Sequence, residues 1–228
     1  MHKAEFSAIE AFMHTHMNDA AHDKFHVYRV LNFALEIAAA EAGVNFDVLI
    51  AAALLHDIGR ERQFADPSLC HAQTGGEMAR TFLTARGWEG PKADHVQACI
   101  TTHRFRQANP PATLEAKIIF DADKLDAAGA LGIARTLIYC GQMNEILYTL
   151  DESNHIITEN DNSHSETFFQ EYTFKLQHVY DKFYTPRANE IAAQMQKTAQ
   201  HFHKNLHAEI TDNHQQGVAL LNKVLTRG

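Results

Sequence analysis

The chain has 228 residues, 45% of them hydrophobic, which is long and apolar enough to bury a core and excludes a chain that is disordered throughout. The formal net charge is −8, from 28 acidic and 20 basic residues, so the surface repels phosphate backbones and we expect no nucleic-acid partner. A small phosphorylated substrate stays compatible with this charge, because a bound cation reverses the potential inside one pocket.

Cysteine usage and hydropathy indicate the compartment. The three cysteines, Cys70, Cys99 and Cys140, are far apart and form no CxxC pair, as is typical of reduced thiols in a cytoplasmic protein. The amino-terminal residues contain no apolar signal-peptide core. The longest apolar run, 48–55, is too short to span a bilayer, so we expect a cytoplasmic location and no membrane partner.

Apolar residues recur at helical spacing along most of the chain, and no alternating run bounded by turns favours strands. The pattern therefore predicts an all-α fold. The predicted helices, in chain order, cover 25–42, 47–58, 74–86, 91–103, 113–127, 130–149, 164–184 and 187–209, and an amphipathic helix or tail covers 213–228.

The helix over 47–58 is apolar on almost every side, which predicts a central and buried position. Asn45 is a candidate amino-terminal cap for this helix, and Thr74 and Thr113 are candidates for two later ones. Two longer stretches, 60–73 and 151–163, break the helical pattern and predict connections.

The strongest chemical signal is the adjacent pair His56 and Asp57, at the carboxyl end of that buried helix. Burying a carboxylate costs several kcal/mol unless a positive group compensates for it. A divalent metal would supply this compensation and bind both side chains. The alternative is a buried His–Asp hydrogen bond near the end of a helix.

Two other segments carry similar residue types. His22 and His26 are four residues apart and share a face if both are helical. Asp121, Asp123 and Asp126 lie within six residues of otherwise apolar sequence, which is hard to explain as a solvated face. At helical spacing Asp123 and Asp126 share a side, and Asp121 points elsewhere.

These segments together resemble the HD-domain metal-dependent phosphohydrolases. The resemblance is carried by 54–60, Leu-Leu-His-Asp-Ile-Gly-Arg, and by 121–130, Asp-Ala-Asp-Lys-Leu-Asp-Ala-Ala-Gly-Ala, with Gly-Ile-Ala-Arg following. These phrases are similar to those of a bacterial subgroup that hydrolyses nucleotide pyrophosphate bonds. The resemblance implies a compact multi-helix bundle with a central metal site. The implied metal ligands are His26, His56, Asp57 and Asp123, with Asp121 as the weaker candidate for the last position.

The resemblance covers roughly 20–140, so we expect one HD domain over 1–212, with the helices of 141–212 packed on its core, and a helix or tail over 213–228. It implies hydrolysis of nucleoside (deoxy)triphosphates to monophosphate and pyrophosphate by attack of a metal-bound water. The alternatives are a nucleoside monophosphate phosphatase, another phosphodiesterase and a non-catalytic nucleotide sensor. The aromatic carboxyl-terminal helices offer a surface for a homodimer.

Two imidazoles and two carboxylates without a thiolate suit Mn²⁺, Mg²⁺, Fe²⁺, Co²⁺ or Ni²⁺ better than a structural zinc. We expect one such ion. Candidate catalytic residues beside the metal are Asp126, Arg60, His71 and His103. Candidate substrate-binding cations are Lys24, Arg104, Lys124 and Lys175, with Arg106 as a further member of the cluster.

For each of these cations the alternative is an ordinary surface charge. For His71 and His103 the alternatives to phosphate contact or proton donation are a second metal and a helix cap. For Asp126 the predicted role is to orient or deprotonate the attacking water, and the alternative is a salt bridge between helices.

Overall fold

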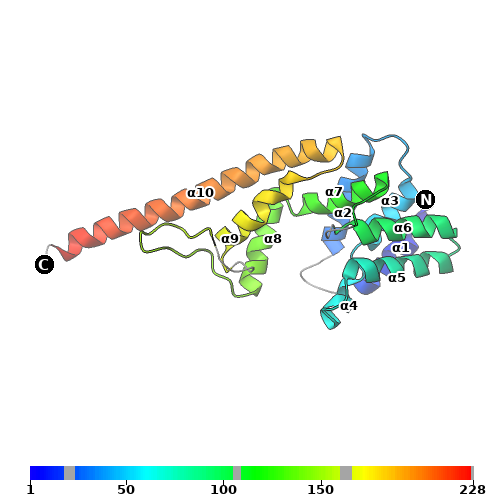
Figure 1. The fold of residues 1–228 in the computed structure, drawn as a ribbon, viewed down its shortest axis with the longest axis horizontal. Helices are drawn as coiled ribbons and strands as arrows, with labels where there is room; N and C mark the ends of the chain where they lie inside the picture. Colours follow the sequence, from blue (N-terminus) through cyan, green and yellow to red (C-terminus); the bar gives the residue numbers. More distant parts are fainter. Residues whose placement is uncertain (18–23, 105–108, 160–165, 227–228) are drawn as a thin grey trace. The chain divides into compact units, whose positions relative to one another are not determined.

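The structure, a computed structural model, describes residues 1–17, 24–104, 109–159 and 166–226. Within these ranges the chain forms ten α-helices and one short 3-10 helix, with two isolated β-bridges, which confirms the predicted all-α class (Figure 1). None of the described helices combines the length and the apolar character that crossing a membrane requires.

The chain divides into two compact units. The first unit consists of Met1–Asp126 with Lys182–Ile191, and the second of Ala127–Asp181 with Ala192–Gly228. The sequence predicts a single domain over 1–212, and this boundary stays a prediction. Within the second unit the helices pack around an apolar cluster of their own.

The first unit contains all segments that carry the candidate metal ligands. Its helices are α1 (Lys3–His16), α2 (Lys24–Ala38), α3 (Phe46–Leu55), α4 (Arg60–Ala65), α5 (His71–Ala85), α6 (Gly90–Thr102) and α7 (Leu114–Asp126), joined by the first residues of α10.

Helix α3 is the centre of this unit, as its sequence predicts. The Asn45 side chain caps it by accepting a hydrogen bond from the Val48 amide at 3.3 Å. The helix contacts α1, α2, α5, α6 and α7, so most of its apolar side chains are buried, while Phe46 in its first turn is exposed. Helix α3 ends in the interior of the unit, and the two residues that follow it, His56 and Asp57, are therefore fully buried.

Of the two later helix caps that the sequence predicts, Thr113 is confirmed and Thr74 is wrong. Thr74 is not a cap, because α5 begins three residues earlier, at His71, and the Thr74 amide already donates to the Cys70 carbonyl at 2.9 Å. Thr113 does cap α7, since its hydroxyl accepts a hydrogen bond from the Ala116 amide at 3.2 Å. The predicted connection 60–73 contains the short helix α4.

The second unit is built from α8 (Gly129–Gln142), α9 (Phe168–Phe174), the 3-10 helix η1 (Leu176–Asp181) and most of α10 (Pro186–Leu225). The predicted helix over 164–184 is therefore broken, and the 3-10 part is tied to α8 by a hydrogen bond from the Gly129 amide to the Tyr180 hydroxyl at 2.8 Å. Residues 213–225 continue α10 and form no separate helix. Of the predicted connection 151–163, residues 160–163 lie outside the described ranges.

Three aromatic side chains of α9 lie in the core of the second unit. Phe168 and Phe169 are fully buried and Tyr172 is almost so, and all three pack with Ile133 and Ala199. These three aromatic residues are therefore core residues and not part of a dimer surface.

Because Gly59 has no side chain, its backbone can lie directly against the first turn of α5. A Cβ atom at Gly59 would overlap the His71 carbonyl and lie 2.6 Å from the Gly75 amide nitrogen. We predict that Gly59→Ala lowers the free energy of unfolding by about 1–3 kcal/mol, because neither backbone can move without displacing His71. Urea denaturation measures this change.

The control for this variant is Gly217→Ala, because Gly217 lies inside α10 with open space around its Cα. This substitution should leave stability unchanged or raise it slightly, since alanine favours helix more than glycine does. Equal effects of the two substitutions would contradict the proposed packing role of Gly59.

Candidate metal centre

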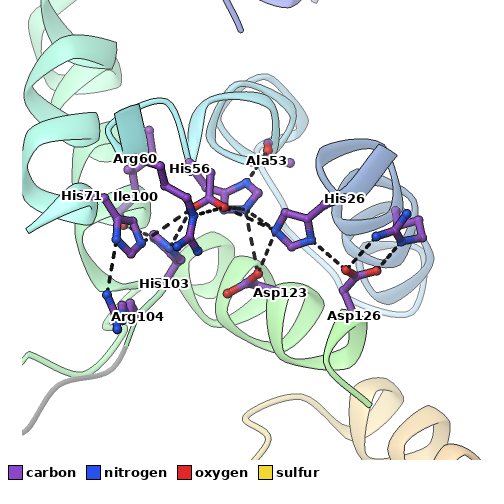
Figure 2. A network of polar contacts seen from close by, with 12 residues as sticks. His26, Ala53, His56, Arg60, His71, Ile100, His103, Arg104, Asp123 and Asp126 are labelled. Atoms are coloured by element: carbon purple, nitrogen blue, oxygen red, sulfur yellow. Dashed lines mark hydrogen bonds and ion pairs between the residues drawn. The ribbon is translucent and has the colours of Figure 1, made fainter. Parts of the chain in front are cut away.

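Four buried histidines from four different elements form a row inside the first unit. His26 lies on α2, His56 follows α3, His71 begins α5 and His103 follows α6. Neighbouring ring centroids are 5.1 Å apart for His26 and His56, 5.2 Å for His56 and His103, and 5.4 Å for His103 and His71. Figure 2 shows this row, with Asp123 beside the His26 and His56 end.

Every ring of the row uses Nδ1 to bond an acceptor that lies outside the centre. The acceptors are the Ala53 carbonyl for His56 at 2.8 Å, the Ile100 carbonyl for His103 at 2.6 Å, the Asp126 carboxylate for His26 at 2.7 Å and the Gln63 amide oxygen for His71 at 2.7 Å. Such an acceptor holds a proton on Nδ1, so the Nε2 atom of a neutral ring presents a lone pair to the centre.

Asp57 lies between the two halves of this row. Its Oδ2 atom is 3.5 Å from Nε2 of both His26 and His56. Its Oδ1 atom is 3.6 Å from Nε2 of His71 and 3.7 Å from Nε2 of His103. Asp123 completes the first half, with Oδ1 3.4 Å from His26 Nε2 and 3.8 Å from His56 Nε2. The structure thus brings together all four predicted metal ligands.

The described residues offer two groups of converging ligand atoms. One group is His26, His56 and Asp123, and the other is Asp57, His71 and His103; in each group the atoms lie within 4.8 Å of one another. Because Asp57 Oδ2 also faces the first group, one carboxylate serves both groups.

The donor atoms of this centre fit a divalent cation. Asp57 Oδ1 and His71 Nε2 are buried, and the described part of the chain gives neither of them a hydrogen-bond partner. Leaving a buried polar atom unpaired costs about 1–3 kcal/mol, and more if it is charged. A cation would satisfy both atoms, and imidazole and carboxylate ligands are those that first-row divalent metals accept.

The protonation states follow from burial and from the neighbouring carboxylates. Burial lowers the pKa of His56 to about 4. Burial acts in the same direction on His26, but hydrogen bonds to Asp123, Asp126 and Asp57 outweigh it and raise the pKa of His26 to about 11. Without a cation, His26 is therefore an imidazolium that donates from Nε2 to His56 Nε2 at 3.1 Å.

The two carboxylates of the centre remain ionised, although Asp57 is fully buried and Asp123 keeps only about a quarter of its side chain exposed. Burial opposes the ionisation of Asp57, but His56, His26 and Arg60 hold its pKa well below the usual range. Burial likewise opposes the ionisation of Asp123, and the hydrogen bond from His26 and the charge of nearby imidazoles lower its pKa. Burial and the charge of Arg60 lower the pKa of His71 to about 3, so this ring is neutral.

The structure does not place Asp126 where its predicted role with the attacking water requires it. The fully buried carboxylate lies on the Nδ1 side of His26, whereas the centre lies on the Nε2 side (Figure 2). Arg29 Nε donates to the other carboxylate oxygen at 2.6 Å. Asp126 therefore orients His26 and does not reach an atom bound at Nε2.

Asp121, the alternative to Asp123 as the last ligand, has a different task. Its two oxygens accept hydrogen bonds from the Tyr184 amide and from the amide and hydroxyl of Thr185, at 2.7–3.1 Å. Asp121 therefore anchors the start of α10 on α7, and the geometry favours Asp123 as the ligand.

Two of the predicted cations lie at the centre. Arg60 Nε donates to Asp57 Oδ2 at 2.6 Å, and the Arg60 side chain keeps about a quarter of its surface exposed. An Arg104 Nη1 atom lies 3.3 Å from His71 Nδ1. Both guanidinium groups therefore border the cluster of ligand atoms, as their predicted role requires.

The other predicted cations have different surroundings. Lys124 Nζ donates to the Lys182 carbonyl at 2.9 Å and lies over the rings of Phe120 and Phe183, so it faces the start of α10. The exposed Lys24 lies over the ring of its neighbour Phe25.

Of three further candidate residues, one belongs to the second unit and two lie outside the described residues. Lys175 belongs to the second unit, where its Nζ donates to Glu171 at 2.8 Å, and its role stays a prediction. His22 and Arg106 lie outside the described residues.

The sequence did not single out Arg29 or Gln63 as functional residues. Arg29 is one helical turn after His26, and this spacing is a signal that could have linked it to the same carboxylate. Gln63 sits in a stretch without a helical or chemical pattern, and only the folded chain brings it to His71.

Comparison with known proteins identifies the kind of domain that this part of the chain resembles. Residues 25–128 match the family model of the HD domain, which includes every ligand of both groups. Residues 25–128 are therefore similar to the HD domain, and the predicted resemblance to the HD superfamily is confirmed.

Similar proteins extend over both units. The chain is 28% identical to YpgQ of Bacillus subtilis over 195 residues, 84% of this chain and 85% of YpgQ. The crystal structure of YpgQ in complex with ADP superposes with a TM-score of 0.68 at 26% identity, covering 90% of this chain and 97% of YpgQ. An HD-superfamily hydrolase from Bacillus thuringiensis gives a TM-score of 0.70 at 26% identity, covering 91% of this chain and 97% of that protein.

We predict that Asp126→Asn weakens Mn²⁺ binding about 10- to 100-fold, because His26 loses the charged acceptor that orients it. Isothermal titration with Mn²⁺ measures the affinity, and circular dichroism checks the fold. Asp94→Asn is the matched control, since Asp94 pairs with Arg80 on the surface of the same unit. Unchanged Mn²⁺ affinity in folded Asp126→Asn would contradict the role of Asp126.

Proposed function

We propose that this chain is a metal-dependent phosphohydrolase that converts nucleoside (deoxy)triphosphates to the monophosphate and pyrophosphate. In this reaction the oxygen of water forms a bond to the α-phosphorus. The bond from that phosphorus to the oxygen that bridges it to the β-phosphorus breaks, and pyrophosphate leaves with this oxygen.

The observation that carries the proposal is the convergence of four imidazole Nε2 atoms on one buried carboxylate. A divalent cation bound there would polarise a phosphoryl oxygen and lower the pKa of water, which is the chemistry that phosphate hydrolysis at neutral pH needs. The ligands proposed for a first cation are His26, His56, Asp57 and Asp123.

The second group supports a second cation. Asp57 Oδ1, His71 Nε2 and His103 Nε2 converge as closely as the ligands of the first group do. This arrangement favours a metal role for His71 and His103 over direct contact with phosphate. The sequence alone favours one ion, whereas the two groups of ligand atoms favour two.

The chain's own cations fit a substrate with several phosphates. The formal net charge is −8, so the surface as a whole opposes a triphosphate. Arg60 and Arg104 bring guanidinium groups to the border of the metal centre, and guanidinium binds phosphate oxygens through two parallel hydrogen bonds. These two residues would hold the phosphates and balance charge that develops during cleavage.

A nucleotide as the substrate class is supported by the relative that was crystallised with ADP. YpgQ shares the fold over most of both chains, and its structure contains a nucleoside diphosphate. A purine nucleotide therefore fits at least one protein of this architecture.

The test is a hydrolysis panel with purified protein and Mn²⁺. Nucleoside and deoxynucleoside triphosphates, diphosphates and monophosphates are incubated separately, and phosphate and pyrophosphate are separated afterwards. The proposal predicts pyrophosphate from triphosphates, and loss of activity after chelation or in His56→Ala. Release of phosphate from monophosphates would favour the phosphatase, and nucleotide binding without turnover would favour the sensor.

We predict that Arg104→Ala lowers kcat/KM for a triphosphate roughly 10- to 100-fold, the value of one hydrogen bond to a charged group. Lys124→Ala serves as the control, because its Nζ is bonded to a backbone carbonyl and covered by aromatic rings. Activity should change little in this variant. A larger loss in Lys124→Ala than in Arg104→Ala would show that the two cations had been assigned wrongly.

A further inference from the structure

We infer that Gln63 is a positioning residue that fixes the tautomer of His71, and thereby sets the affinity of the Asp57, His71 and His103 group for a divalent cation. The inference rests on the proposed function, because it concerns how the second cation of that site is held. The four histidine rings differ in the group that accepts the hydrogen bond from Nδ1.

Three of the four rings are anchored by groups that cannot easily move. His56 and His103 donate to carbonyls three residues earlier in their own helices. His26 donates to the buried Asp126, which Arg29 holds in turn. The anchor of His71 is of another kind, a neutral glutamine side chain that comes from α4, a helix of only six residues.

The orientation of this glutamine amide is determined by its second hydrogen bond. Gln63 Nε2 donates to the Leu69 carbonyl at 3.0 Å, and Gln63 Oε1 faces His71 Nδ1 at 2.7 Å. If the amide were turned over, its oxygen would face the carbonyl oxygen of Leu69, and two acceptors would repel each other. Oε1 therefore stays toward His71.

An acceptor at this position selects one tautomer of the ring. The proton must sit on Nδ1 of His71, which leaves a lone pair on Nε2. That Nε2 atom is buried, has no hydrogen-bond partner in the described part of the chain and lies 3.6 Å from Asp57 Oδ1. The tautomer that Gln63 selects is thus the one that can bind a cation together with Asp57.

Arg104 favours the opposite tautomer of His71. Its Nη1 atom lies 3.3 Å from the same His71 Nδ1, and a guanidinium group can only donate. A hydrogen bond from Arg104 would require Nδ1 without a proton and would move that proton to Nε2. Without the Gln63 acceptor, Arg104 therefore favours the tautomer that blocks the second group.

The first test titrates the wild-type chain and Gln63→Ala with Mn²⁺ by isothermal titration. We expect two cations in the wild type, and in Gln63→Ala an unchanged first cation and a second that binds about 10- to 100-fold more weakly. Gln63→Glu supplies a carboxylate acceptor to Nδ1 and should restore the second cation. Gln73→Ala is the matched control, because Gln73 is an exposed glutamine of α5 that bonds Glu77.

The second test reads the tautomer directly, without any cation or activity. Nitrogen-15 NMR of protein labelled at histidine reports which ring nitrogen of His71 carries the proton. The wild type, Gln63→Glu and Gln73→Ala should carry it on Nδ1, and Gln63→Ala should shift it to Nε2. An unchanged tautomer or an unchanged second affinity in folded Gln63→Ala would overturn the inference, as would a wild type that binds one cation.

Two other results would contradict the proposed function and not the role of Gln63. A wild-type chain that binds no cation, or that binds two and hydrolyses no nucleotide, would contradict the proposed function. The tautomer of His71 in Gln63→Ala would then still decide whether Gln63 positions that ring.

Discussion

The carboxylate of Asp57, buried among four imidazoles, is the constraint on which the first unit depends. Its two oxygens face Nε2 atoms that come from α2, α5 and the ends of α3 and α6, and one of these oxygens has no hydrogen-bond partner among the described residues. An ionised carboxylate in such a place is destabilising unless positive charge compensates for it. Arg60 provides part of that charge, and without a cation the imidazolium of His26 adds to it. A divalent cation would take the place of the His26 Nε2 proton and use the lone pairs that the tethered rings present.

The parts of this arrangement that the sequence predicts are those in which local pattern and tertiary position coincide. Helix α3 is apolar on almost every side, which predicts a central position and the burial of the two residues that follow it. The burial of His56 and Asp57 follows from this helix alone, whereas their role as metal ligands does not. His26 and Asp123 cannot be derived in that way, because they lie on separate helices, and it was the resemblance to the HD domain that selected them. The apolar cluster of the second unit cannot be predicted in this way, since helical spacing indicates which face of a helix is apolar but not which other helix covers it.

The roles of the remaining site residues depend on where their side chains point, and this can be seen only in the folded chain. Asp126 and Asp123 share a side of α7 at helical spacing, yet one approaches His26 from Nδ1 and the other from Nε2, which gives them different roles. Asp121 looks equivalent in sequence and instead binds amides at the start of α10, which is 63 residues away. Lys124 was expected beside phosphate because it neighbours Asp123, but successive residues of a helix point in different directions. Gln63 has no sequence signal, because its partner is defined by the path of the chain between α4 and α5.

The central claim is that these side chains surround a divalent cation, and anomalous diffraction from crystals grown with Mn²⁺ tests it most directly. The account predicts a strong anomalous peak within coordination distance of His26 Nε2, His56 Nε2 and the carboxylates of Asp57 and Asp123. A second, weaker peak is expected between Asp57, His71 and His103. Anomalous maps without a peak among the four histidines, from crystals in which Mn²⁺ is bound elsewhere on the chain, would contradict the account.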